Sequence, residues 1–180
     1  SFYKKALNSF IKQHVTEDIK ISSIVISSVI PAITGAITDA VKSVCNRKPL
    51  IISHRISADM SFAVKNPEKV GADRIANAIA AWQHTKTDTI VADLGTATTL
   101  SVIDRQKNFL GGAILPGLYT MASSLAIHTA QLPNVNIKAA DSALGKDTSS
   151  AVLSGILFGT AGAIEKIVKN NKNTKTTKTQ

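Results

Sequence analysis

The chain has 180 residues, of which 44% are hydrophobic and 4% aromatic, and it carries a formal net charge of +9 at pH 7. This length is enough to bury a core in one large or two small domains. Cys45 is the only cysteine, which excludes an internal disulfide, and the four histidines are scattered, which argues against a structural zinc site. No uninterrupted apolar run approaches the ~20 residues of a membrane helix, and the first residues lack the apolar segment of a secretory signal. We therefore expect a cytoplasmic protein with no membrane partner.

Lysines concentrate near the two ends of the chain. Apolar character is lost after Val168, and lysine recurs through the remaining residues, which is typical of a disordered tail over residues 169–180. A basic excess occurs in nucleic-acid-binding proteins, where it neutralises phosphates. Aromatic residues are few, however, and no recognition motif accompanies the lysines. We interpret them as solvated surface and expect no nucleic-acid partner.

The hydrophobic pattern alternates between helical and strand periodicity, which indicates an α/β protein. Residues 1–47 form the predicted C-terminal part of a first lobe, and residues 48–168 form a predicted second lobe. The first lobe has too few strands to close its own sheet, so we expect it to be incomplete and the chain to be cut at both ends. The predicted elements, in chain order, are a helix at 2–14, a strand at 19–30, a helix at 32–45, a strand at 49–53, a helix at 71–82, strands at 90–92, 98–103 and 108–115, a helix from 116–117 to about 127, and a long helix from 147–150 past 164.

The stretch from residue 89 to residue 104 is a predicted hairpin with a compact polar turn at residues 93–96. Gly95 allows a positive φ or a close approach of a ligand, and Thr96 offers a hydroxyl beside turn N–H groups that can face phosphate oxygens. Asp93 places a carboxylate at the bend. An ordinary tight hairpin, in which Asp93 bonds to its own turn, explains the same residues equally well.

An adjacent acid and base, Asp73 and Arg74, stand at the predicted start of the helix after residue 71. A carboxylate is favoured there by the helix dipole and can accept a proton from a substrate hydroxyl. A guanidinium can hold an anionic substrate. The alternative is a helix cap beside a surface arginine.

A third polar group, at residues 144–148, precedes the last helix. Thr148 can cap that helix or bind a polar substrate, and Lys146 can meet a phosphate. Residues 111–117 are glycine-rich and are interpreted as a turn. The chain contains neither of the common glycine-rich nucleotide-binding loops and no nucleophile elbow, so activation of a hydroxyl by an aspartate is the best chemical interpretation.

Five segments together resemble the type III pantothenate kinases, and they occur in that family's order over the chain up to about Glu165. They are residues 27–31 (SSVIP), 67–74 (PEKVGADR), 93–99 (DLGTATT), 111–117 (GGAILPG) and 145–148 (GKDT). The resemblance implies a ribonuclease-H-like, actin-like two-lobed kinase fold around a nucleotide cleft, usually in a homodimer. It implies ATP-dependent phosphorylation of pantothenate to 4′-phosphopantothenate, the first step of coenzyme A biosynthesis.

The resemblance also assigns roles to individual residues. Asp73 matches the general base, and residues Gly71, Ala72, Asp73 and Arg74 match the segment that contacts pantothenate. Thr148 matches a further substrate contact and Thr96 a contact to the ATP phosphates. Asp93 matches the ligand of a monovalent cation, K⁺ or NH₄⁺, and Mg²⁺ would accompany the ATP.

The chain departs from the family pattern at three places. The N-terminal phosphate loop, Asp-x-Gly-Asn-Thr, and the later Thr-Gly-Gly segment near the adenosine are absent from these 180 residues, and Val64 stands where many members carry a substrate-lining tyrosine. The missing phosphate loop supports an alternative function, that of a non-catalytic regulatory or partner-binding member of the family.

Overall fold

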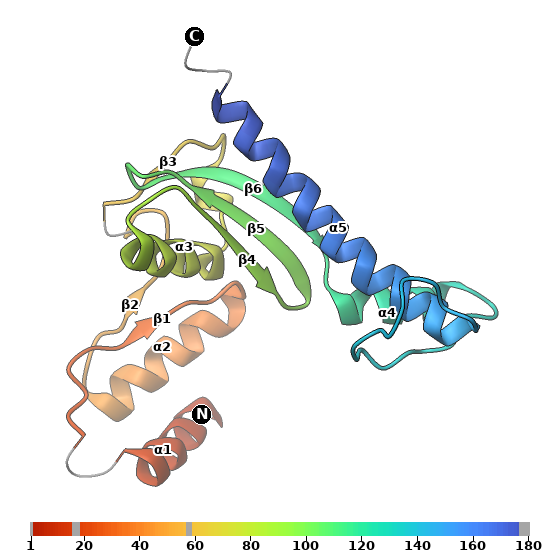
Figure 1. Ribbon diagram of the computed structural model, residues 1–180. Helices are drawn as coiled ribbons and strands as arrows, with labels where there is room; N and C mark the ends of the chain where they lie inside the picture. The colour runs from red at the N-terminus through yellow and green to blue at the C-terminus, as the bar shows by residue number, and fades with distance from the viewer. Residues whose placement is uncertain (1, 16–18, 57–58, 177–180) are drawn as a thin grey trace. The chain divides into compact units, whose positions relative to one another are not determined.

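The computed structural model describes residues 2–15, 19–56 and 59–176, with side chains up to residue 171. Helices and short strands alternate in the first half, and the second half contains three longer strands, a short helix and one long helix (Figure 1). The elements are α1 Phe2–His14, β1 Val25–Ile26, α2 Pro31–Cys45, β2 Leu50–Ile51, β3 Ser61–Phe62, a 3₁₀ turn at Pro67–Lys69, α3 Ala72–Thr85, β4 Thr89–Leu94, β5 Ala97–Ile103, β6 Asn108–Pro116, α4 Leu118–His128 and α5 Thr148–Thr176.

The chain divides into two compact units. The first contains Ser1–Asp88 and Ile103–Leu110, and the second contains Thr89–Val102 and Gly111–Gln180. The division crosses β5 and β6, which belong to a four-stranded sheet of order β3-β6-β5-β4. It does not coincide with the boundary predicted near residue 47, and the assignment of residues 1–47 and 48–168 to separate lobes stays a prediction.

The first unit combines three helices with short parallel strand pairs. β1 pairs with β2, in the register Val25↔Leu50 and Ile26↔Ile51, and β3 pairs with the start of β6. α1 and α2 pack against each other. The core side chains of this unit include Ile75 on α3 and Phe109 on β6, both almost fully buried. Mixed α/β structure is therefore confirmed, as the hydrophobic pattern predicts.

The strand predicted over residues 19–30 is much shorter in the structure. Only Val25–Ile26 form ladder bonds, because the neighbouring β2 also has only two residues. After β1 the chain turns at Ser28, whose hydroxyl oxygen accepts hydrogen bonds from the backbone N–H of Ile30 and the hydroxyl of Thr34. Pro31 then begins α2 at a position where a proline costs no helical hydrogen bond.

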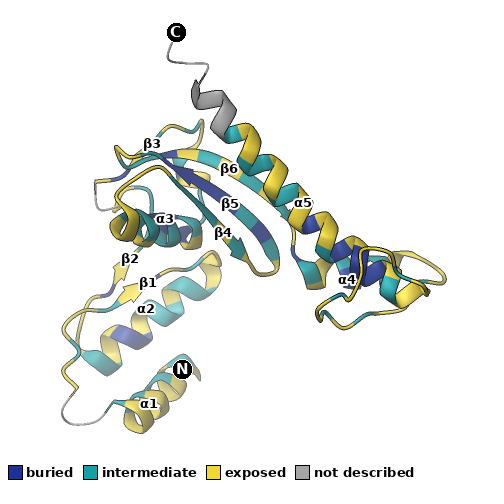
Figure 2. Ribbon diagram, viewed as in Figure 1, coloured by how far each residue is buried: buried dark blue, intermediate teal, exposed yellow. Residues whose placement is uncertain are grey.

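The second unit contains most of the β4–β5 hairpin and the two helices that follow it in sequence, α4 and α5. α4 packs against α5 through a cluster of Ala122, Val152 and Ile156. Strand β5 is buried along most of its length (Figure 2). Leu100, Ser101, Val102 and Ile103 are all buried, so this part of the strand is covered on both faces and does not alternate between buried and exposed side chains.

The last helix extends further than the sequence predicts. α5 runs to Thr176, so residues 169–176, expected in a disordered tail, are helical here, and residues 177–180 lie outside the described residues.

Within α5, Thr148–Asn171 has the length and mean hydropathy, 1.5, of a membrane-spanning helix, although no such helix is expected from the sequence. The buried Val152 and Ile156 show that the N-terminal part of this segment packs against protein. A core helix of a globular protein meets the same criteria of length and composition.

The N-terminus of α5 is capped by Asp147 and not by Thr148, the candidate that the sequence analysis names. The Oδ1 of Asp147 accepts the backbone N–H of Ser150 at 3.0 Å, and its Oδ2 accepts the Ser150 hydroxyl at 2.7 Å. These bonds, the backbone N–H first, lower the pKa of the Asp147 carboxyl from its ordinary 3.8. Its ionised form therefore stabilises the folded state above the unfolded-state pKa, and this contribution disappears as the pH falls through the lower folded-state value.

We expect Asp147→Asn to remove the pH-dependent contribution of this carboxyl to stability, because asparagine caps a helix without titrating. The thermal midpoint of the wild type should exceed that of the variant at about pH 7, and the gap should shrink between about pH 4 and pH 2. Thermal unfolding followed by circular dichroism across this range measures both. Asp39→Asn, on the exposed surface of α2, controls for the loss of one negative charge, and a gap that is constant with pH would contradict the assignment.

Candidate active site

The predicted acid–base pair lies in the first turn of α3. Gly71 is the N-cap residue, so Asp73 lies inside the first turn and not at the N-cap position. The Asp73 carboxylate is exposed and accepts the backbone N–H of Arg74 at 2.7 Å through Oδ1. A Cβ on residue 71 would meet this same Oδ1, so a larger residue there would displace the Asp73 side chain. Because first-turn N–H groups have no intrahelical partner, this bond is of the capping type, and the interpretation of Asp73 as a capping residue stays an alternative.

Arg74 is held by an aromatic ring from a neighbouring strand. Its guanidinium carbon lies 5.4 Å from the centroid of the Phe109 ring, which in turn contacts the Phe62 ring. Partial burial lowers the pKa of Arg74, and the nearby Asp73 carboxylate opposes that shift. An arginine stays protonated in proteins. The side chain therefore offers a permanent positive charge next to an exposed carboxylate.

A cavity of about 620 Å³ lies beside this turn, in the same unit. Gly71 and Ala72 line it together with residues of the segments before α2 and after β2, among them Ser28, Val29 and His54. Val64 is half-buried between β3 and the 3₁₀ turn, and it is not among the residues that line this cavity. Two of the four residues predicted to contact pantothenate, Gly71 and Ala72, therefore border an open space of small-molecule size, whereas Asp73 and Arg74 are not among its lining residues.

The hairpin of the second unit has a two-residue tip, Gly95 and Thr96. Asp93 is half-buried within β4, so its predicted position at the bend is wrong, and the carboxylate stands two residues before the tip. Gly95 has no positive φ, and a Cβ there would meet only ordinary contacts. The glycine that the turn needs is Gly117, because a Cβ at that position would collide with the carbonyl groups of Gly95 and Thr96.

The hairpin tip is bonded to the start of α4. The Thr96 carbonyl oxygen accepts the Gly117 N–H at 2.9 Å and the Thr120 hydroxyl at 2.6 Å. Gly95 and Thr96 line a cavity of about 560 Å³, and α4 contributes side chains that are mostly hydroxyl-bearing, namely Tyr119, Thr120, Ser123, Ser124, Ile127 and His128. Sequence analysis missed Thr120. The only signal was its position three residues after the Pro116-Gly117 turn, at the start of a helix.

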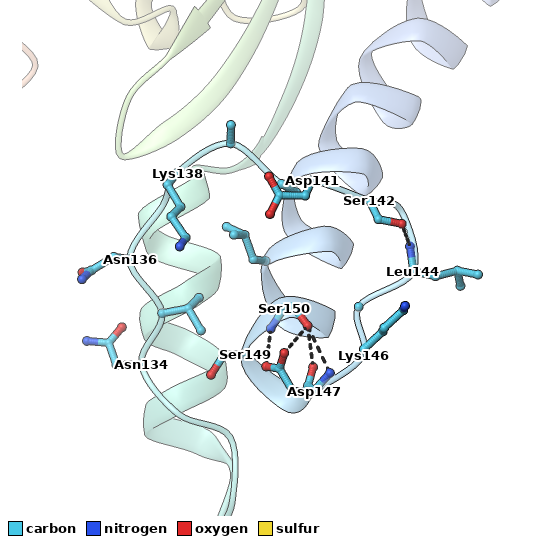
Figure 3. Close-up of a pocket in the computed structure, with 15 residues that line it drawn as sticks. Asn134, Asn136, Lys138, Asp141, Ser142, Leu144, Lys146, Asp147, Ser149 and Ser150 are labelled. Carbon is cyan, nitrogen blue, oxygen red and sulfur yellow. Dashed lines mark hydrogen bonds between the residues drawn. The ribbon is translucent and has the colours of Figure 1, made fainter.

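Thr148 is the first residue of α5 and is exposed. Because Asp147 caps the helix, the Thr148 hydroxyl is not needed as a cap. Thr148 lines a cavity of about 600 Å³ to which Thr120 and Ser124 also contribute, so Thr148 and Thr96 border neighbouring spaces that share residues of α4. Lys146 is exposed and borders a separate cavity of about 700 Å³ between residues 134–147 and α5 (Figure 3).

Within the described ranges, no group of three His, Cys, Asp or Glu side chains is arranged to hold a metal ion. Asp93 is the predicted cation ligand, and its half-buried carboxylate fits a hard cation that takes oxygen donors. A site with a single carboxylate supplies little negative charge, which suits a singly charged ion better than a divalent one.

One family of known proteins matches nearly the whole chain. The sequence profile described as "Type III pantothenate kinase" matches residues 2–170. The chain belongs to the type III pantothenate kinase family. A curated relative with that name, from Dictyoglomus turgidum (strain DSM 6724 / Z-1310), is 40% identical over 159 residues, which are 88% of this chain and 62% of the relative. The chain therefore spans less than two thirds of that relative's length.

A solved structure resembles the fold. It is described as the crystal structure of a conserved putative Baf family transcriptional activator from Campylobacter jejuni, and it superimposes with a TM-score of 0.56. The alignment covers 89% of this chain and 68% of that structure at 20% sequence identity. At this identity the likeness supports the fold alone. The sequence-based assignment to the pantothenate kinase family is confirmed by the profile and the curated relative.

We expect Gly117→Ala to destabilise the second unit by about 1–3 kcal/mol, because the added methyl forces the hairpin tip or α4 to move. Urea denaturation measures the loss. Gly159→Ala is the control, since nothing lies within 4 Å of a Cβ at that helical position. Alanine there should be neutral or stabilising by up to about 1 kcal/mol through helix propensity. Equal stability of the Gly117→Ala variant and the wild type would contradict the close packing of tip and helix.

Proposed function

We propose that this protein phosphorylates pantothenate with ATP, giving 4′-phosphopantothenate and ADP in the first step of coenzyme A biosynthesis. The observation that carries the proposal is the exposed carboxylate of Asp73 in the first turn of α3, which lies beside the positive charge of Arg74. Membership of the family supports the same reaction.

In the proposed reaction Asp73 accepts the proton of the primary hydroxyl of pantothenate. The hydroxyl oxygen forms a bond to the γ-phosphorus of ATP, the bond from that phosphorus to the β–γ bridging oxygen breaks, and ADP leaves. Arg74 binds the substrate carboxylate, and Gly71 and Ala72 let the substrate approach the backbone. Phosphoryl transfer needs little covalent participation from the protein, so catalysis depends on positioning and charge neutralisation.

The remaining assigned residues bind the substrates and a cation. Thr96 contacts the phosphates of ATP, which enters with Mg²⁺, and Thr148 contacts pantothenate. Asp93 would hold K⁺ or NH₄⁺, which would neutralise phosphate charge near the hairpin. We place these residues in an actin-like, ribonuclease-H-like two-lobed fold and in a cytoplasmic homodimer, as the family resemblance implies.

The general base is tested by Asp73→Asn, which keeps the size of the side chain and removes its basicity. Turnover should fall by about 10²–10⁴-fold. Formation of 4′-phosphopantothenate is measured with MgATP and K⁺ in the protein at its full natural length. Asp39→Asn, an exposed carboxylate on α2, should leave turnover unchanged. If the wild type binds both substrates without turnover, the protein is a non-catalytic member of the family; if Asp73→Asn keeps full turnover, another residue is the base.

The cation site is tested by titrating K⁺ in an Asp93→Asn variant. The amide keeps an oxygen donor but loses the negative charge, so half-maximal activity should require about tenfold more K⁺ or greater. Turnover at saturating K⁺ should recover in part. An unchanged K⁺ requirement would contradict the role of Asp93 as the cation ligand.

A further inference from the structure

The hydroxyl of Thr120 donates to a distant element, unlike the hydroxyls of three other threonines in or next to helices. Thr38, Thr129 and Thr160 each donate to the carbonyl four residues earlier in the same helix or helix end. Thr120 instead donates out of α4, to the carbonyl oxygen of Thr96, 24 residues away on the hairpin tip. A hydroxyl that leaves its own helix constrains the element that it reaches.

The bond acts on the residue that the proposed function assigns to the nucleotide phosphates. The Thr96 carbonyl accepts two donors from the start of α4, the Gly117 N–H and the Thr120 hydroxyl, which together fix the direction of that carbonyl. The Thr96 side chain is exposed beside the cavity that Thr120 also lines. Since a backbone carbonyl and its side chain share one Cα, fixing the carbonyl limits the directions in which the Thr96 hydroxyl can point.

We propose that Thr120 is a positioning residue for nucleotide binding, which holds the hairpin tip so that Thr96 faces the phosphates. The inference rests on the proposed function, because it assigns Thr120 to the ATP side of the same site. Thr120 also borders the cavity that Thr148 lines, but its hydroxyl proton is donated to the Thr96 carbonyl, so we assign it no hydrogen bond to pantothenate. Loss of its hydroxyl therefore weakens the binding of MgATP and leaves the binding of pantothenate unchanged.

The kinetic test compares Thr120→Val, which has nearly the same shape without the hydroxyl, with Thr120→Ser, which keeps it. In Thr120→Val the KM for MgATP should rise by about three- to tenfold, the effect of one hydrogen bond, while the KM for pantothenate stays within about twofold. Thr120→Ser should restore the wild-type KM for MgATP. Thr129→Val, at the C-terminal end of α4, removes a hydroxyl that bonds the Leu125 carbonyl and the Leu132 N–H, away from the hairpin tip, and should change neither value.

A second measurement does not depend on catalysis. Amide hydrogen exchange of Gly117, whose N–H donates to the same carbonyl, should be about three- to tenfold faster in Thr120→Val than in the wild type, and unchanged in Thr129→Val. Calorimetry with MgATP should show a matching loss of affinity. Unchanged exchange at Gly117, or equal increases in both KM values, would overturn the positioning role.

The two proposals fail in different ways. Binding of MgATP by the wild type without phosphorylation of pantothenate would overturn the kinase reaction alone, and the calorimetric comparison would still decide the role of Thr120. A wild type that binds no MgATP would overturn both. Normal turnover with an unchanged KM for MgATP in Thr120→Val would overturn only the role of Thr120.

Discussion

The carbonyl oxygen of Thr96 connects the hairpin of the second unit to its helices. It accepts two hydrogen bonds from the start of α4, and the approach is possible only because residue 117 has no side chain. α4 is in turn held against α5 by the cluster around Ala122 and Ile156. The position of a two-residue tip therefore depends on a hydrophobic contact between two helices. The hydroxyl-lined cavity at the tip follows from this arrangement.

The first unit places a negative and a positive side chain, Asp73 and Arg74, next to each other on α3, and different contacts hold each of them. Asp73 stays exposed because the backbone at Gly71 leaves room for its carboxylate and because the helix dipole favours a negative charge in the first turn. Arg74, one residue later, turns toward the Phe109 ring and is partly desolvated. A proton acceptor and a fixed cation thus come from neighbouring positions of one helix, without a buried ion pair whose desolvation would be costly.

The residues with proposed roles stand at the ends of secondary-structure elements. Asp73 is the second residue of α3, Asp93 is the last residue but one of β4, Thr96 lies at the tip between β4 and β5, and Thr148 begins α5. Such positions leave backbone N–H groups free to meet anions and allow side chains to point away from the core. This placement explains how a solved structure with 20% identity retains the fold, since the fold depends on apolar patterns between these short polar segments.

The sequence by itself determined the helices and the family. Apolar side chains at helical spacing define α1, α2 and α3 to within a few residues, because helical hydrogen bonds are local to the segment that makes them. Five short motifs identified the family without any tertiary information. A cap at the start of α5 could be predicted because a cap bonds within its own helix, although the capping residue is Asp147 and not Thr148.

Only the tertiary structure decided the strands and the tip. The strand predicted from residue 19 shortened to Val25–Ile26 because a strand extends only as far as its partner. Asp93, predicted at the bend, lies within β4. The glycine that allows the hairpin tip to approach α4 is Gly117 and not Gly95. The bond of Thr120 to the hairpin tip could not be predicted, since its partner is 24 residues away and a bond between distant elements leaves no periodic pattern in the sequence.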